Sequence, residues 1–198
     1  MNHRKFIIIT LSLFFSYTGY SQLNNDIQQR IQTLKSKGID TFVCYYEDCY
    51  SDLWFPTYDT NCIITERKYL FWIKNGVYFR QNFDNCLTSK VFSFDISPFL
   101  DLFRSKLDSI KYAEIKPVIS RNTKKKGNKK IVVETTSTVD HTCVCNFDIY
   151  INNQIINKSI NKFELETDSL FDGSININYK ANQKSILKRL KDALIKEL

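Results

Sequence analysis

The clearest structural signal in the sequence is KYLFWIKNGVYFRQ, residues 68–81. Aromatic and β-branched side chains flank an Asn75-Gly76 pair here. Asn-Gly between two such runs is the strongest short-range mark of a β-hairpin, because both turn positions require a positive φ. The pattern predicts two antiparallel strands joined by a two-residue turn. Their expected cross-strand partners are Lys74 with Val77, Ile73 with Tyr78, Trp72 with Phe79, and Phe71 with Arg80.

Other elements follow on both sides of this hairpin. Ser97-Pro98 is typical of a helix start, with a capping hydroxyl and a proline at the first helical position. We expect strands at 41–46, 90–95, 131–139, 142–151, 155–166 and 174–179, helices at 24–38, 97–116 and 185–198, an irregular loop at 47–60, and a connection between strands at 124–130. This order predicts a single α+β domain over residues 22–198, with a largely antiparallel sheet and an N-terminal, a central and a C-terminal helix.

The expected N-terminal helix shows an apolar spacing of four and three residues at Ile27, Ile31 and Leu34. Asn24-Asn25-Asp26 offers capping side chains at its start, and Gly38 stands where a left-handed C-terminal cap is common. Two further turns are expected, at Asn152-Asn153 and at Asp172-Gly173.

Residues 1–21 have the pattern of a cleavable secretory signal peptide. His3, Arg4 and Lys5 form a positive start, an apolar run covers residues 6–15, and Gly19-Tyr20-Ser21 places small residues before a cleavage point. A membrane anchor would need roughly 20 apolar residues, which this segment lacks. We therefore expect a periplasmic or secreted protein without a transmembrane span after signal removal.

Composition excludes several classes of function. Only 5 glycines occur among 198 residues, and neither the dinucleotide-binding nor the P-loop glycine spacing is present. His141 is the only histidine after the signal, so zinc hydrolase patterns that need two histidines are excluded, and any Ser-His or Cys-His catalysis would have to use His141. We expect no cofactor.

All cysteines lie beyond the signal: Cys44, Cys49, Cys62, Cys86, Cys143 and Cys145. An even number in an exported chain suggests up to three disulfides, and six cysteines allow fifteen connectivities. Within this set, His141, Cys143 and Cys145 share one face if they lie on a strand, and could begin a metal or thiol site. Phe147 and Ile149 continue that face, so disulfides or buried thiols are the favoured interpretation.

The 47–60 loop combines acidic and aromatic side chains. Carboxylates with sugar-stacking rings leave an exported hydrolase that uses Asp or Glu of residues 45–59 as one alternative. If the loop faces solvent, it would instead form a protein-binding patch. The candidate binding residues are Asp48, Asp52, Trp54, Phe55 and Tyr58.

The chain has 28 basic and 21 acidic side chains, and a net charge of +7. Loss of Arg4 and Lys5 with the signal leaves 26 basic side chains and a charge of +5. The run Lys124–Lys130 could contact anionic lipid or lipopolysaccharide, although a solvated turn that keeps strand edges apart is the simpler interpretation. We expect no nucleic-acid partner.

The signal ending in Gly-Tyr-Ser-Gln, the Asn-, Lys- and Ile-rich composition, and the segment from Tyr69 to Cys86 resemble small exported proteins of Bacteroidota without assigned function. Asp108-Ser109-Ile110 and Asp168-Ser169-Leu170 also resemble the O-glycosylation acceptor of that phylum, and Ser169 is the better candidate because Ser109 falls inside an expected helix. The resemblance implies no functional residues. From the shortage of catalytic groups, we expect a non-catalytic interaction protein, of the inhibitor or immunity type, with a protein partner in the envelope or outside the cell.

Overall fold

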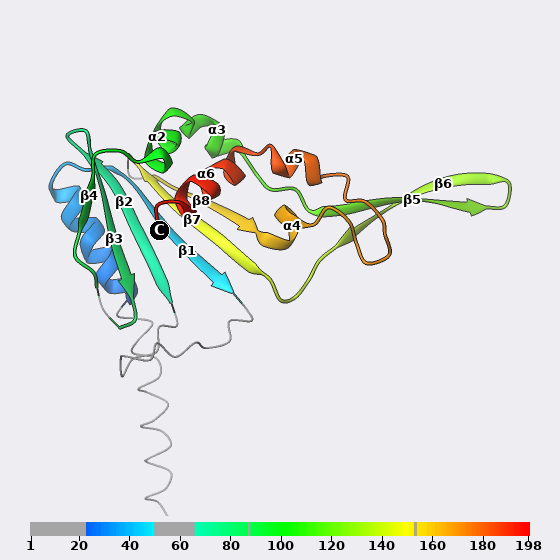
Figure 1. Ribbon diagram of the computed structural model, residues 1–198, viewed down its shortest axis with the longest axis horizontal. Coiled ribbons are helices and arrows are strands. Elements are labelled where there is room, and N and C mark those ends of the chain that lie inside the picture. Colours follow the sequence, from blue (N-terminus) through cyan, green and yellow to red (C-terminus); the bar gives the residue numbers. More distant parts are fainter. Residues whose placement is uncertain (1–22, 50–65, 87, 153) are drawn as a thin grey trace, which may run out of the picture.

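The computed structural model describes residues 23–49, 66–86, 88–152 and 154–198. Its main sheet has six strands in the order β4-β3-β2-β1-β7-β8 (Figure 1), and all neighbouring strands in it are antiparallel. The expected α+β class is confirmed. The six strands are β1 (Thr41–Cys49), β2 (Arg67–Lys74), β3 (Val77–Asp84), β4 (Phe92–Phe94), β7 (Cys143–Ile151) and β8 (Gln154–Asn161). The expected signal peptide, residues 1–21, lies outside the described residues.

The hairpin formed by β2 and β3 has the register that the sequence predicts. All four expected pairs are present, including Trp72 with Phe79 and Phe71 with Arg80. Asn75 and Gly76 have φ values of 52° and 79°, so both turn residues are in the left-handed region that this turn requires.

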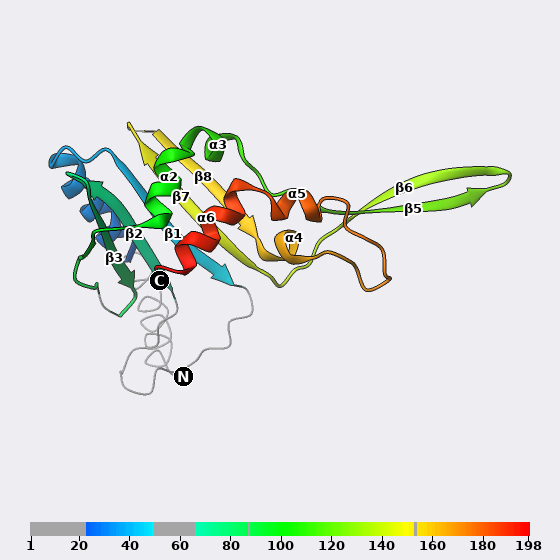
Figure 2. The same cartoon turned by 45° about the horizontal axis from the view of Figure 1, so that its top comes forward.

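Helices cover both faces of the main sheet. The helix at 23–36 lies on one face, and α2 (Pro98–Ser105), α3 (Leu107–Tyr112) and α6 (Ile186–Ile195) lie on the other (Figures 1 and 2). Strand β1 is buried on both sides, because Phe42 and Cys44 face the first helix while Val43 and Tyr45 face the second layer. Such a double-sided core explains why β1 reads as a continuous apolar run.

The helix ends follow their sequence signals in most places. Gly38 has φ 73°, and its N–H donates to Lys35 O while Ile39 N–H donates to Leu34 O, both at 3.0 Å, which forms a Schellman cap. Ser97 Oγ accepts from Leu100 N at 3.1 Å, which confirms the start of α2.

The expected cap at Asn24–Asp26 is wrong. The helix already includes Leu23, which is 2% exposed and extends the apolar stripe of Ile27 by one turn. The central helix is also divided, because Lys106 leaves helical geometry at φ −124° and ψ 18° between α2 and α3.

One expected strand is shortened, and another is replaced by other structure. The strand at 155–166 ends at Asn161, whose side-chain oxygen accepts from Phe163 N at 2.9 Å and caps α4 (Lys162–Glu166). The segment 174–179 forms single bridges, Ser169 with Ile175 and Ser120 with Asn176, before α5 (Tyr179–Gln183) begins. In both places an asparagine side chain forms hydrogen bonds with backbone groups that would otherwise pair with a neighbouring strand.

A second, two-stranded sheet projects from the body of the molecule (Figure 1). It consists of β5 (Val118–Lys126) and β6 (Lys129–Ser137), and residues 118–137 are called the β5–β6 arm below. The sequence indicated only a connection at 124–130, and the structure shows that this segment is the distal end of a hairpin. Gly127 has φ 62° in the turn.

Candidate binding surface

The root of the β5–β6 arm is held by the buried side chain of Asn182. This amide is 1% exposed, and its oxygen accepts from Lys116 N at 2.9 Å. Its nitrogen donates to Lys116 O at 2.8 Å and to Glu164 O at 2.9 Å. A single asparagine therefore satisfies both backbone groups of Lys116, one residue before Pro117 leads into β5.

A second buried asparagine fixes the first turn of the arm. Asn176 is 2% exposed, and its oxygen accepts from Ile119 N at 3.2 Å, while its nitrogen donates to Thr167 O at 2.8 Å. Ile177 N–H donates to Ile119 O at 2.9 Å, which adds a backbone contact on the same strand. A buried amide without hydrogen-bond partners destabilises the folded state. These bonds are therefore retained, and they fix the direction in which the arm leaves the body.

The distal half of the arm contacts nothing else in the described part of the chain. Residues 121–132 are exposed on both faces of the ribbon, although Val118 and Ser120 at the root are buried. An isolated two-stranded ribbon is only marginally stable in water, so packing does not explain why this one extends so far.

The tip of the arm concentrates positive charge. Lys125 lies opposite Lys130 and Lys126 lies opposite Lys129, so two like-charged pairs face each other directly across the strands. Such pairs destabilise a hairpin. Within the described residues no acidic group forms a salt bridge with the tip lysines. The five lysines, called the tip lysines below, are Lys124, Lys125, Lys126, Lys129 and Lys130.

The only acidic residue of the arm, Glu134, is already paired with Arg121, whose Nε donates to Glu134 Oε1 at 3.0 Å. The arm thus has six basic side chains against one acidic side chain, a net charge of +5. A surface of this kind is complementary to an anionic partner.

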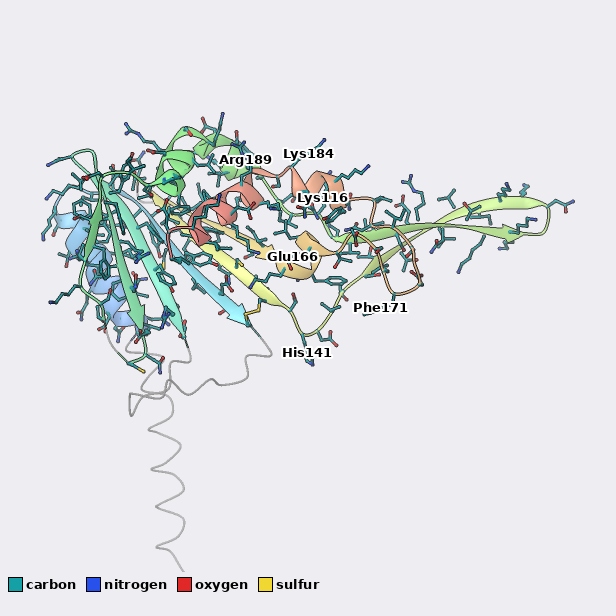
Figure 3. All side chains as sticks on the ribbon, viewed as in Figure 1. Lys116, His141, Glu166, Phe171, Lys184 and Arg189 are labelled. Carbon is teal, nitrogen blue, oxygen red and sulfur yellow. A yellow bond between two sulfur atoms is a disulfide. The ribbon has the colours of Figure 1, made fainter. Side chains whose placement is uncertain are left out.

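An apolar loop lies beside the root of the arm. Phe171 is fully exposed at its turn (Figure 3), and Ile175 and Ile177 are 72% and 44% exposed. The segment 167–177 is called the Phe171 loop below. Leu170 N–H donates to Ser174 O at 2.8 Å, and Asp172 accepts from Ser174 N at 2.9 Å, so the loop has a defined shape. The hydrogen bonds from Ser174 lower the pKa of Asp172.

The loop also contains the glycosylation candidate Ser169, which is exposed and donates to Asp168 Oδ1 at 3.1 Å. Ser109 lies within α3, as expected. Whether either serine is modified stays a prediction.

The binding patch expected from the sequence is placed only in part. Asp48 is exposed near the end of β1 and accepts from Asn146 Nδ2 at 2.8 Å. The other four residues lie outside the described residues: Asp52, Trp54, Phe55 and Tyr58. The structure therefore neither assembles nor separates this patch.

The cysteines divide between a cross-strand disulfide and buried thiols. Cys49 and Cys143 face each other across β1 and β7 and are bonded, at a sequence separation of 94. Cys86 is also disulfide-bonded, and Cys62 lies outside the described residues. Cys44 and Cys145 are free and buried. Burial raises the pKa of Cys44 to about 12 and also raises that of Cys145, which keeps both as thiols.

The expected trio of His141, Cys143 and Cys145 is not brought together as one polar group. His141 is exposed in the bend before β7, Cys143 is bonded to Cys49, and Cys145 points into the core with Phe147. Among the described residues, no three His, Cys, Asp or Glu side chains are placed to hold a metal ion.

A partly buried polar cluster surrounds Glu47 at the end of β1. Its carboxylate accepts from Tyr45 OH, from Cys145 Sγ at 3.5 Å and from Lys162 Nζ at 3.0 Å. Burial alone would raise the pKa of Glu47, but the hydrogen bonds from Tyr45 and Lys162 outweigh it and lower the pKa. Burial and the bond to Glu47 raise the pKa of Tyr45.

This cluster is suited to holding strands and helices together. The pKa of Lys162 is raised, because its contact with Glu47 outweighs its burial.

Asp48 lies on the sheet face opposite Glu47, since successive strand residues alternate faces, and it accepts from Asn146 there. The two carboxylates of β1 therefore do not converge, although the hydrolase hypothesis needs such a pair.

A cavity of about 520 Å³ is lined by residues from the end of the first helix and the start of β1, from the β2–β3 turn and from α2. Its lining includes the apolar side chains of Trp72, Leu100 and Phe103 and the cations Lys37 and Arg104. These cations stand at the C-terminal ends of the first helix and of α2, where they stabilise the helix dipoles. Their placement is explained without a ligand.

The sequence predicted a strand at 131–139, which overlaps β6, and a turn at Asp172-Gly173, but it did not predict strand β5 or the projecting arm. The Gly127-Asn128 pair between Ile131-Val132-Val133 and Val118-Ile119 was the available hairpin signal.

Comparison of the chain with protein-family models, curated proteins and solved structures finds no match. Among the described residues, no helix is long and apolar enough to span a membrane.

Proposed function

We propose that this chain is an exported, non-catalytic binding protein, and that the β5–β6 arm and the Phe171 loop form the surface that meets its partner. One observation carries the proposal: five exposed lysines end a ribbon whose root is fixed by two buried asparagines. The arm thus holds positive charge at a distance from the body, although like-charged pairs across its strands destabilise it. Such an arrangement is expected of an element that contacts a partner, and not of one that packs in the core.

Export to the periplasm or the exterior is part of the proposal. The signal-like residues 1–21 support it, and so does the Cys49–Cys143 disulfide, since disulfides persist mainly in oxidising compartments. The inhibitor or immunity type of action, with a protein partner, stays a prediction. We also propose that the chain is related to small exported proteins of Bacteroidota.

A photo-crosslinking side chain placed at Asn128, at the arm turn, tests the contact in the native envelope. The matched control is the same group at Lys90, which is exposed between β3 and β4. We expect a discrete adduct of protein, glycan or lipid from position 128 and none from position 90. Equal adducts from both positions, or none from position 128, would contradict the proposal.

A further inference from the structure

We infer that the partner of the β5–β6 arm is the surface of an anionic phospholipid bilayer, so that the arm attaches the protein peripherally to a membrane. This inference rests on the proposed function and assigns a chemical class to the partner. It is carried by the chemistry of the exposed tip lysines and by the apolar side chains that lie beside them.

The first support is the type of cation. All five basic residues at the tip are lysines. The one arginine of the arm, Arg121, is paired with Glu134. Protein–protein interfaces are enriched in arginine and depleted in lysine, because arginine binds carboxylates in a fixed bidentate geometry. Lysine ammonium groups are flexible point charges, and clusters of four to eight basic residues are typical of segments that bind anionic lipid headgroups.

The second support is the arrangement of the charges on the ribbon. Lys125 and Lys130 lie on one face, and Lys124, Lys126 and Lys129 lie on the other, since cross-strand partners share a face. A ribbon with cations on both faces presents no flat, single-sided docking surface. It fits a layer of headgroups, into which the tip can enter with phosphates on either side.

The third support is the exposed apolar surface. Ile131 lies opposite Lys124 and is 41% exposed, and Val132 next to it is 58% exposed. At a bilayer, aromatic and aliphatic side chains enter the boundary between headgroups and acyl chains while lysines reach the phosphates.

The length of the arm agrees with this role. A nine-residue antiparallel strand spans about 30 Å. The buried asparagine contacts at the root keep this length directed away from the body, so that the main sheet stands clear of the surface that the tip contacts. We expect attachment to be reversible and salt-sensitive, because exposed charges are screened within about 10 Å at moderate ionic strength.

Co-sedimentation of the oxidised, signal-free chain with vesicles tests this inference. One set of vesicles contains phosphatidylcholine alone, and the other contains phosphatidylcholine with phosphatidylglycerol. In the test variant all five tip lysines become glutamine: K124Q, K125Q, K126Q, K129Q and K130Q. In the matched control five exposed lysines of the body that form no salt bridge with described residues are replaced: K37Q, K74Q, K90Q, K106Q and K196Q.

Both variants lower the net charge by the same amount, so they separate a local effect from a global one. We expect the unaltered chain to bind only the vesicles with phosphatidylglycerol. Each lysine near an anionic surface contributes about fivefold to partitioning, so the tip variant should bind at least about 100-fold more weakly. The control should stay within about threefold of the unaltered chain, since its charges lie away from the contact. Val132→Ser should weaken binding about threefold or more, because its apolar side chain beside the tip lysines no longer enters the interface.

The inference is overturned if the unaltered chain fails to bind the anionic vesicles, or if both sets of five substitutions weaken binding equally. A protein adduct from position 128 together with no vesicle binding would show that the partner is a protein. That result would overturn the lipid inference and leave the proposed function standing. Absence of both adduct and vesicle binding would overturn both.

Discussion

The β2–β3 hairpin and the β5–β6 arm are of nearly equal length, and they differ in what surrounds them. The β2–β3 hairpin lies inside the main sheet, with Leu70, Phe71 and Trp72 almost fully buried. The β5–β6 arm has nine cross-strand pairs and buries only its root. The first hairpin is stabilised by packing on both faces, whereas the second keeps its place through backbone contacts with two asparagines. The contrast distinguishes the buried residues of β2 and β3, which stabilise the fold, from the exposed distal residues of the arm, which are available to contact a partner.

The strongest test of this contrast is a truncation in each hairpin. Phe71→Ala removes a ring that is 1% exposed and lies 4.9 Å from the ring of Phe99. We expect a loss of about 3–5 kcal/mol in the free energy of unfolding, from lost burial and the remaining cavity. Val132→Ala in the arm should change it by less than about 0.5 kcal/mol. Denaturant titration measures both, and equal losses would refute the contrast.

The asparagine contacts at the arm root provide a second test. Asn182→Ala leaves both backbone groups of Lys116 and the carbonyl of Glu164 without their partner, and we expect a loss of about 2–3 kcal/mol. Amide hydrogen exchange should rise first in residues 116–120. The control Asn157→Ala removes only an exposed bond to Asp148 and should cost under about 0.5 kcal/mol. Unchanged exchange at the root in Asn182→Ala would disprove its anchoring role.

A third pair of variants compares ion pairs in the two regions. Because the pKa of Glu47 is lowered in the folded state, its carboxylate stabilises the fold above the ordinary carboxyl pKa, and this contribution disappears as pH falls through the folded value. Glu47→Gln should therefore cost about 1 kcal/mol at pH 7, after allowance for partial exposure.

The cost of Glu47→Gln should vanish at an acidic pH below the folded-state pKa of Glu47, because its carboxyl is protonated there in both the folded and the unfolded state. Glu134→Gln, in the exposed pair of the arm, should cost less than about 0.5 kcal/mol at pH 7. Thermal unfolding followed by circular dichroism at the two pH values measures these differences. A pH-independent cost for Glu47→Gln would contradict the assigned role of its carboxylate.

The smallest effect is expected from the tip itself. K125Q with K130Q removes one like-charged cross-strand pair and should stabilise the arm by a few tenths of a kcal/mol. Hydrogen exchange of arm amides should slow, while the unfolding temperature of the body stays constant. Added salt should slow the same amides in the unaltered chain, since it screens the repulsion. Faster exchange in the double variant would show that the lysines do not repel each other.

The body was largely predictable from sequence because its elements carry local signals. Asn75-Gly76 fixed the hairpin register, and Ser97-Pro98 and Gly38 marked helix ends. Alternation of Cys145, Phe147 and Ile149 indicated a strand with a buried face, which the structure shows.

The candidate binding surface was not predictable in the same way. Alternating apolar and polar residues mark a strand because one face is buried, and the distal arm buries neither face. The run from Arg121 to Lys126 therefore has no period to detect. The roles of Asn176 and Asn182 also have no local sequence signal, because their side chains bind backbone groups up to 66 residues away.

The most direct test of the division between body and arm is a trimmed chain in which Asn-Gly replaces residues 122–133. The new turn joins Arg121 to Glu134, which are already cross-strand partners. We predict an unfolding temperature within about 3 °C of the full chain, since a change under 1 kcal/mol shifts it by only that much in a domain of this size. We also predict complete loss of binding to phosphatidylglycerol vesicles and to envelope components. Retained binding, or a fall in unfolding temperature above about 8 °C, would contradict the account.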